Sequence, residues 1–245
     1  MELGGAVALV TGAARNIGRA IALELAAAGA AVVVNAKTSK AEAQGVADEI
    51  EASGGRATVM IADVTDPAAV AAMIAETVQR YGRLDVLVNN AAVRDESLFG
   101  DMTFARWHAV LAVVLDGAFL CTQSALPHLR TSGRGAVVNL GGLTAHTGAS
   151  HRAHVVTAKA GIVGLTRALA HELSAEQITV NCVVPGLIET VRTGKPPTHR
   201  AGKTTLVGRN GTPGDVAGTV RWLAGPAARY VTGQTIHVNG GMYLS

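Results

Sequence analysis

Three histidines, His146, His151 and His154, lie within nine residues of one another, and Lys159 follows them. An imidazole titrates near neutral pH, so it can give or take a proton during a reaction. Residues spaced by four lie one turn apart on one face of a helix. If a helix starts early enough, His151 and Lys159 share a face, and His154 lies about 100° away from it. His151 and His154 are therefore candidate acids or bases; the alternative is that they are ordinary loop histidines at a helix start.

A glycine-containing turn comes near the N-terminus, where Thr11-Gly12 ends a strand-like run and Gly18 opens a helical pattern. Such a turn lets backbone N–H groups and the positive end of the helix face a pyrophosphate. Asn16 stands inside the turn, and Asn tolerates a left-handed backbone better than most residues. The turn is a candidate dinucleotide site, the alternative being an ordinary tight turn.

Short Val-rich runs alternate with longer helical patterns along the whole chain. The runs are nearly continuous in apolar residues, which is typical of strands covered on both faces in a parallel sheet. The predicted strands are Ala6–Val10, Ala31–Asn35, Ala57–Ala62, Leu84–Asn89, Ala136–Leu140, Thr179–Val184 and Thr235–Val238. The predicted helices include Ile17–Ala28, Pro67–Tyr81, Phe104–Arg130 and Ala153–Leu173. No linker interrupts the alternation, so we expect a single α/β domain over residues 1–245.

The composition excludes several classes of protein. Hydrophobic residues make up 49% of the 245 residues, and the net charge is only +3. The sequence has no stripe of basic residues with aromatics between them, which is the pattern typical of nucleic-acid binding. Two isolated cysteines, Cys121 and Cys182, form no metal-binding or disulfide pattern, so we expect no metal. We find no signal peptide and no apolar run long enough to span a bilayer. A cytoplasmic protein without membrane association is expected.

The first turn resembles the Thr-Gly-x-x-x-Gly-x-Gly cofactor loop of the short-chain dehydrogenase/reductase family, with Asn16 in place of the middle Gly. Further segments resemble family motifs in the same order: Asp63-Val64, Asn89-Asn90-Ala91-Ala92, Asn181 to Gly186 with Thr190, Gly211 to Asp215, and Tyr230 to Gln234. The resemblance implies a doubly wound Rossmann fold with a seven-stranded parallel sheet in the order 3-2-1-4-5-6-7. It also implies a nicotinamide cofactor, a small-molecule ligand and a homotetramer or homodimer.

By the same resemblance, one set of residues is expected to contact the cofactor. These are Gly12, Arg15, Asn16, Ile17, Gly18, Lys37, Asp63, Val64, Asn89, Ala91, Lys159, Pro185, Gly186, Ile188 and Thr190.

The choice of dinucleotide depends on the end of the second strand. An acidic residue there would bind the ribose 2′-hydroxyl of NAD, but the chain has Asn35 followed by Ala36 and Lys37. Lys37 and Arg15 could face a 2′-phosphate, so we expect NADP(H) rather than NAD(H). The alternative is that both are solvated surface charges.

The family's chemistry uses a Tyr, a Ser and an Asn in addition to the Lys. By alignment of the flanking motifs, Val155 stands in place of the Tyr, Gly142 in place of the Ser and Val114 in place of the Asn, whereas Lys159 is retained. Valine cannot donate a proton, and losing a positioned acid costs about 10²–10⁴-fold in rate.

We therefore expect ordinary carbonyl or alcohol hydride transfer to be weak or absent, in a protein that still holds its cofactor. The alternative is an active NADP(H)-dependent oxidoreductase, or a non-redox lyase, in which His151 or His154 acts as a substitute acid.

Residues 187–210 break the strand–helix alternation and are rich in Gly, Pro, Thr and basic residues. We interpret them as a substrate lid. Its basic and imidazole side chains could clamp an anionic ligand or could be solvated: Arg192, Lys195, His199, Arg200 and Lys203.

Overall fold

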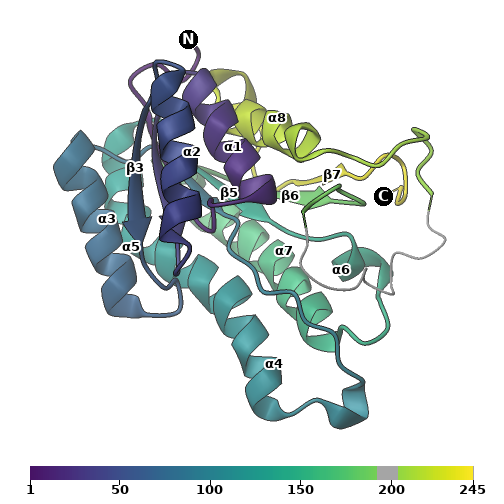
Figure 1. Ribbon diagram of the computed structural model, residues 1–245. Coiled ribbons are helices and arrows are strands. Elements are labelled where there is room, and N and C mark those ends of the chain that lie inside the picture. Colours follow the sequence, from purple (N-terminus) through teal and green to yellow (C-terminus); the bar gives the residue numbers. More distant parts are fainter. Residues whose placement is uncertain (192–203, 245) are drawn as a thin grey trace.

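The computed structural model describes residues 1–191 and 204–244. Seven parallel strands form one sheet in the order β3-β2-β1-β4-β5-β6-β7 (Figure 1), which confirms the predicted fold and strand order. The strands are β1 (Val7–Val10), β2 (Ala31–Ala36), β3 (Arg56–Ile61), β4 (Val86–Asn89), β5 (Ala136–Leu140), β6 (Thr179–Pro185) and β7 (Thr235–Val238).

Helices cover both faces of the sheet. One face carries α1 (Asn16–Ala27), α2 (Lys40–Ala52) and α8 (Pro213–Ala224); the other carries α3 (Pro67–Tyr81), α5 (Gly117–Ser132) and α7 (Ala153–Leu173) (Figure 1). Successive residues of a strand point to opposite faces. Ala8 and Val10 accordingly pack with the first set of helices, whereas Val7 and Leu9 pack with the second. This two-sided burial explains the continuous apolar runs.

The long helix predicted over Phe104–Arg130 is interrupted. The structure has α4 (Phe104–Leu111), a π-helical segment over Ala112–Asp116, and then α5. A π-helical turn inserts extra backbone into a helix and is often found near functional sites. A short helix, α6 (Thr144–Thr147), also precedes α7, and the sequence did not predict it.

The continuous stretch Phe104–Ser132 corrects the expectation that no apolar run is long enough to cross a membrane. It reaches 29 residues with a mean hydropathy of 1.7 over its most apolar window. Length and composition alone are weak grounds, because a core helix passes the same test. Here α4 packs against α7, and α5 packs against α3 and the sheet.

The buried carboxylate of Asp85 connects the amino-terminal end of β1 to two nearby loops. Asp85, whose side chain is 1% exposed, accepts a hydrogen bond of 2.8 Å from the N–H of Val7. It also pairs with the guanidinium groups of Arg83 and Arg134. Val7 and Arg134 are distant from Asp85 in the sequence, so this carboxylate fixes the amino-terminal edge of β1 and β4.

We expect Asp85→Ala to lower the free energy of unfolding by about 3–5 kcal/mol, because it leaves two cationic groups and a backbone donor without their partner. Urea unfolding of the purified protein measures the change. Asp48→Ala, at an exposed position on α2, is the control and should change the unfolding free energy by less than about 0.5 kcal/mol. Equal stability of the two variants would contradict the prediction.

Candidate active site

Side-chain amides from neighbouring strands hold the turn between β1 and α1. Asn90 donates from Nδ2 to the carbonyl oxygens of Thr11 and Gly12, both at 2.9 Å. The N–H of Gly12 donates to Oδ1 of Asn35 at 3.2 Å. Gly12 and Asn16 have left-handed backbones, with φ of 61° and 53°. The turn is thus fixed at the carboxyl ends of the strands, where open parallel sheets bind ligands.

The start of α1 fits a phosphate group. No side chain among the described residues caps its first N–H groups, and no acidic residue lies in its first turn. A Cβ on Gly18 would lie 2.3 Å from the carbonyl oxygen of Gly12, so only glycine permits this close packing. Backbone donors beside a glycine turn suit the pyrophosphate of a dinucleotide. The cradle formed by Gly12, Ile17 and Gly18 therefore fits the expected cofactor.

The end of β2 carries no carboxylate. Asn35 is buried there, and its amide nitrogen donates to the carbonyl oxygens of Met60 and Ala62. Lys37 forms a 2.6 Å ion pair with Asp63, and the hydrogen bond from Lys37 lowers the pKa of that carboxyl.

The second expected cation, Arg15, lies 3.8 Å from Glu42 in another exposed pair. Exposed ion pairs contribute little stability, so both cations can exchange these partners for a phosphate.

Residues at the end of β4 and just after it lie beside the turn between β1 and α1. Asn89 donates from Nδ2 to Thr122 at 3.1 Å and to Asn139 at 2.8 Å. The N–H of Ala91 donates to the hydroxyl of Thr11 at 3.0 Å. Val64, at the end of β3, is buried.

The segment after β6 approaches the same turn. The N–H of Gly186 donates to the carbonyl oxygen of Val238 at 2.9 Å, and a Cβ on Gly186 would collide with Asn239 at 2.7 Å. Asn16 donates from Nδ2 to the carbonyl oxygen of Val191 at 3.2 Å. The structure therefore brings together two stretches that are far apart in sequence and that the sequence predicts to contact the cofactor. The second spans Pro185, Gly186, Ile188 and Thr190.

Lys159 lies in the second turn of α7 and donates from Nζ to the carbonyl oxygen of Leu140, at the end of β5. Burial lowers the pKa of Lys159 to about 8, and the positive charges of Arg94 and Arg152 act in the same direction. A cationic amine at this edge of the sheet can hold ribose hydroxyls and can also stabilise developing negative charge.

The three positions where the family resemblance places Ser, Tyr and Asn lie around this lysine. An added Cβ on Gly142 would meet Cγ of Lys159 at 3.5 Å, which is ordinary contact. Val114 and Val155 are 3% and 5% exposed and belong to one apolar cluster with Ala158. Val114 lies in the π-helical segment. Aliphatic packing therefore occupies two of these positions.

His154 is fully buried at the start of α7 and does not reach solvent. Its Nε2 lies 2.9 Å from Oδ2 of Asp95, which also accepts two hydrogen bonds from Arg106. The hydrogen bonds from the Arg106 guanidinium hold the pKa of Asp95 well below its ordinary value. The hydrogen bond with His154 acts in the same direction with a smaller effect. His154 thus ties the loop after β4 to α7, which is a positioning role.

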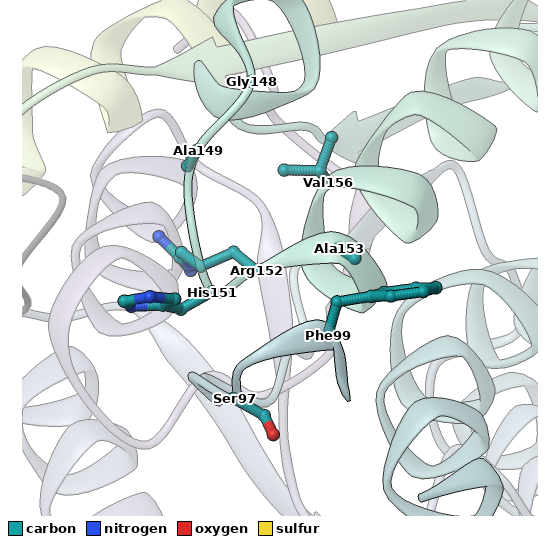
Figure 2. Close-up of a pocket in the computed structure, with 8 residues that line it drawn as sticks. All are labelled: Ser97, Phe99, Gly148, Ala149, His151, Arg152, Ala153 and Val156. Carbon is teal, nitrogen blue, oxygen red and sulfur yellow. The ribbon is translucent and has the colours of Figure 1, made fainter. Parts of the chain in front are cut away.

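His151 lines a pocket of about 320 Å³ in front of α7 (Figure 2). The other lining residues are Ser97, Phe99, Gly148, Ala149, Arg152, Ala153 and Val156. His151 has a left-handed backbone, with φ of 63°, and its carbonyl oxygen accepts a 2.8 Å hydrogen bond from the N–H of Ser97. Strained non-glycine residues of this kind cluster at functional sites.

His146 is directed elsewhere. Its ring lies 4.6 Å from that of His237 and 5.5 Å from that of Tyr243, measured between centroids. Burial lowers the pKa values of His146 and His237.

Sequence reasoning missed several residues of this site. Asp95, Arg106, Ser97 and Phe99 carry no motif that relates them to α7. The residues that Asp95 and Ser97 contact there, His154 and His151, lie more than fifty residues further along the chain. Asn90 was detectable, since it belongs to the Asn-Asn-Ala-Ala segment.

Half of the proposed lid over residues 187–210 lies outside the described residues. The lid side chains Arg192, Lys195, His199, Arg200 and Lys203 all fall in the omitted range 192–203. The lid therefore stays a prediction.

Comparisons with known proteins extend over the whole chain. A family profile described as "Enoyl-(Acyl carrier protein) reductase" matches residues 12–243. The chain is 43% identical over 240 residues to "3-oxoacyl-[acyl-carrier-protein] reductase FabG" of Staphylococcus aureus, covering 97% of this chain and 98% of the relative. It is 37% identical to the reductase of the same name from Escherichia coli, with full coverage of both chains.

These relatives contradict the expectation that ordinary hydride transfer is weak or absent, because proteins similar over their full length are named as reductases. That expectation equated the loss of three side chains with the loss of every proton donor. The fold, however, still brings Lys159 to the end of β5 and presents His151 in a neighbouring pocket. The comparisons favour the alternative interpretation, an active oxidoreductase.

Solved structures agree with the sequence comparisons. A dehydrogenase/reductase from Sinorhizobium meliloti is similar with a TM-score of 0.94 and 36% identity, covering 99% of this chain and 97% of that one. A variant of a short-chain dehydrogenase/reductase from Serratia marcescens has a TM-score of 0.90 and 33% identity, with 99% coverage of both chains. With the nucleotide cradle and the sheet order already described, these matches show that this chain belongs to the short-chain dehydrogenase/reductase family.

Proposed function

We propose that the chain is an NADP(H)-dependent oxidoreductase that reduces the carbonyl group of a small 3-oxoacyl-type compound. One observation carries the proposal. The first two turns of α7 place the amine of Lys159 at the end of β5 and flank a pocket that contains an imidazole. The similarity to 3-oxoacyl reductases over the full length supports the same reaction type.

A reduced nicotinamide, held by the turn between β1 and α1 and by Lys159, would provide the hydride for the carbonyl carbon. The protein would provide the proton for the oxygen, so that the product is an alcohol. His151 is the better donor of the two candidate histidines, because it lines the pocket whereas His154 is buried against Asp95. Lys159 stabilises the negative charge that develops on the oxygen. This assignment makes the active site atypical for its family.

NADP(H) is favoured by the charges around the end of β2. Asn35 offers no carboxylate to a ribose hydroxyl, since its amide is directed inward. Lys37 and Arg15 are exposed cations on either side, held only by weak surface pairs.

We also propose that the protein is cytoplasmic and forms a homodimer or homotetramer. Large apolar side chains remain exposed on α4 and α5, with Phe104 at 79% and Phe119 at 48%. Small residues such as Ala160 and Gly164 leave the outer side of α7 open to a second copy.

We expect Lys37→Ala to weaken NADPH binding about tenfold or more, because it removes a charge-assisted hydrogen bond to the 2′-phosphate. NADH binding should change by less than about threefold, because NADH lacks the 2′-phosphate. Fluorescence titration of both cofactors measures the difference. Arg56→Ala, an exposed cation at the opposite end of β3, is the control. Equal loss for both cofactors would argue against a 2′-phosphate partner.

We expect His151→Gln to lower kcat for carbonyl reduction by about 10²–10⁴-fold while NADPH binding is kept, since the variant lacks the proton donor. Single-turnover measurements with NADPH and an acetoacetyl thioester check this. His171→Gln, in the exposed last turn of α7, provides a control. Wild-type turnover in His151→Gln would exclude this imidazole as the acid.

The reduction rate should also fall as pH rises through about 8, where Lys159 loses its proton. The sign follows from the charge: the ammonium form predominates below that pH and stabilises the developing alkoxide, whereas the neutral amine does not. A pH profile of kcat/KM measures the midpoint. In Lys159→Met this alkaline limb should be absent; its persistence would assign the titration to another group.

A further inference from the structure

Three aromatic rings from three different parts of the chain meet beside β7, the edge strand of the sheet. His146 belongs to α6, His237 to β7 and Tyr243 to the segment after β7. The ring centroids of the two histidines lie 4.6 Å apart in an edge-to-face arrangement. The ring of Tyr243 lies 5.5 Å from that of His146 and 4.9 Å from that of His237. Rings at these distances attract one another, and we call the three residues the ring cluster.

The ring cluster connects the two neighbours of the end of β6. On one side β7 pairs with β6, and Pro185 lies opposite Val238. On the other side the N–H of Leu143, just before α6, donates to the carbonyl oxygen of Pro185 at 3.3 Å. The contact between α6 and β7 therefore braces Pro185 and Gly186, which the sequence predicts to contact the cofactor.

The segment after β7 folds back to bring Tyr243 into the ring cluster. Asn239 donates from Nδ2 to the carbonyl oxygen of Tyr243 at 3.0 Å and accepts at Oδ1 from the N–H of Gly241 at 2.8 Å. Tyr243 also packs against the apolar cluster that contains Leu143 and Val155. Residues 239–243 are thus held against the same end of β6.

Each imidazole of the ring cluster has one buried nitrogen without a hydrogen-bond partner. These atoms are Nε2 of His146 and Nδ1 of His237, and neither meets a hydrogen-bonding group within residues 1–191 and 204–244. An imidazolium carries an N–H on both nitrogens. Charging either ring in place would bury a donor and a charge without an acceptor, which is costly.

The surroundings of the ring cluster do not compensate such a charge. Burial lowers the pKa of both imidazoles; Arg167 on α7 adds to this effect at His146, and His146 adds to it at His237. No carboxylate of the described residues acts on either ring. The other ionisable groups that the described parts of the adjoining segments contribute are Tyr243, the buried thiol of Cys182, and Arg209 with its ion-pair partner Asp215.

We propose that the ring cluster is an acid-sensitive switch. At neutral pH it holds Pro185 and Gly186 in the conformation that binds the cofactor; when His146 or His237 takes up a proton, residues 239–243 separate from α6. This inference rests on the proposed cofactor-binding role of that stretch. The open form binds the cofactor more weakly, and bound cofactor therefore keeps the switch closed.

The pH range follows from the ordinary imidazole pKa of 6.5. Above this value the rings are neutral in both forms, so the closed form keeps its full stability. Below it the open form takes up protons more readily than the closed form. One pH unit below 6.5, proton uptake by one imidazole favours opening about tenfold.

Hydrogen–deuterium exchange, corrected for the intrinsic pH dependence of exchange, measures the opening. In peptides covering residues 235–244 we expect protection at about pH 5.5 to be about tenfold lower than at about pH 7.5. A double variant, His146→Phe with His237→Phe, keeps both rings without a titrating group, and its protection should change by less than about threefold. His171→Phe, at an exposed position of α7, should respond like the unaltered protein. Protection that does not depend on pH in the unaltered protein, or an unchanged response in the double variant, overturns the proposal.

A second pair of variants tests the ring contact without altering an imidazole. Tyr243→Ala should lower protection of residues 235–244 at about pH 7.5 about tenfold, whereas Tyr243→Phe should retain it, because phenylalanine keeps the ring. This pair serves the test even if the double histidine variant does not fold. Equal protection in the two Tyr243 variants overturns the role of the ring cluster.

The affinity for NADP⁺ tests the link to the cofactor. Calorimetry gives the ratio of dissociation constants between the unaltered protein and the double histidine variant at each pH, and the titration of the ligand's own phosphate cancels in this ratio. From about pH 7.5 to about pH 5.5 we expect the unaltered protein to lose about tenfold in affinity relative to the variant. Acid-induced opening with an unchanged ratio overturns the link. A protein that binds NADP⁺ in this way but never reduces a carbonyl refutes the reductase function and supports the switch.

Discussion

The site depends on one clamp between neighbouring strands, in which the Asn90 amide donates to the carbonyl oxygens of Thr11 and Gly12. These bonds hold a left-handed turn at the carboxyl end of β1, and that turn sets where α1 begins. The clamp forms only because β1 and β4 are adjacent in the sheet. The order of the strands, through this amide, therefore creates the nucleotide cradle.

The region around Lys159 shows how a cleft can change its chemistry while its backbone is kept. Val114 and Val155 pack into one apolar cluster, and Gly142 lies against the stem of the lysine. Val114 lies in the π-helical segment Ala112–Asp116. Burial in this apolar setting lowers the pKa of Lys159. The aliphatic packing around the lysine thus brings the pKa of its amine closer to neutral pH.

A second interaction, between Asp95, Arg106 and His154, connects the loop after β4 to α4 and α7. The paired carboxylate therefore holds this loop against the two helices. His151 and His154 are three residues apart but lie in different environments. His154 is buried against Asp95, whereas His151 lines a pocket.

The sequence alone determined the sheet, the strand order and the family. Continuous apolar runs such as Ala31–Asn35 require burial on both faces, and ordered motifs such as Thr11 to Gly18 identify the family. The sequence also identified Lys159, since spacing along one helix is local. It misjudged the consequence of Val155, because a missing side chain can be replaced only from elsewhere in space.

Tertiary structure decided what local spacing could not. It buried His154 against Asp95, presented His151 to a pocket and directed His146 toward His237. Three histidines within nine residues of sequence face three different environments, because a loop and a helix start orient them differently. Only the packed chain fixes which of them meets a ligand.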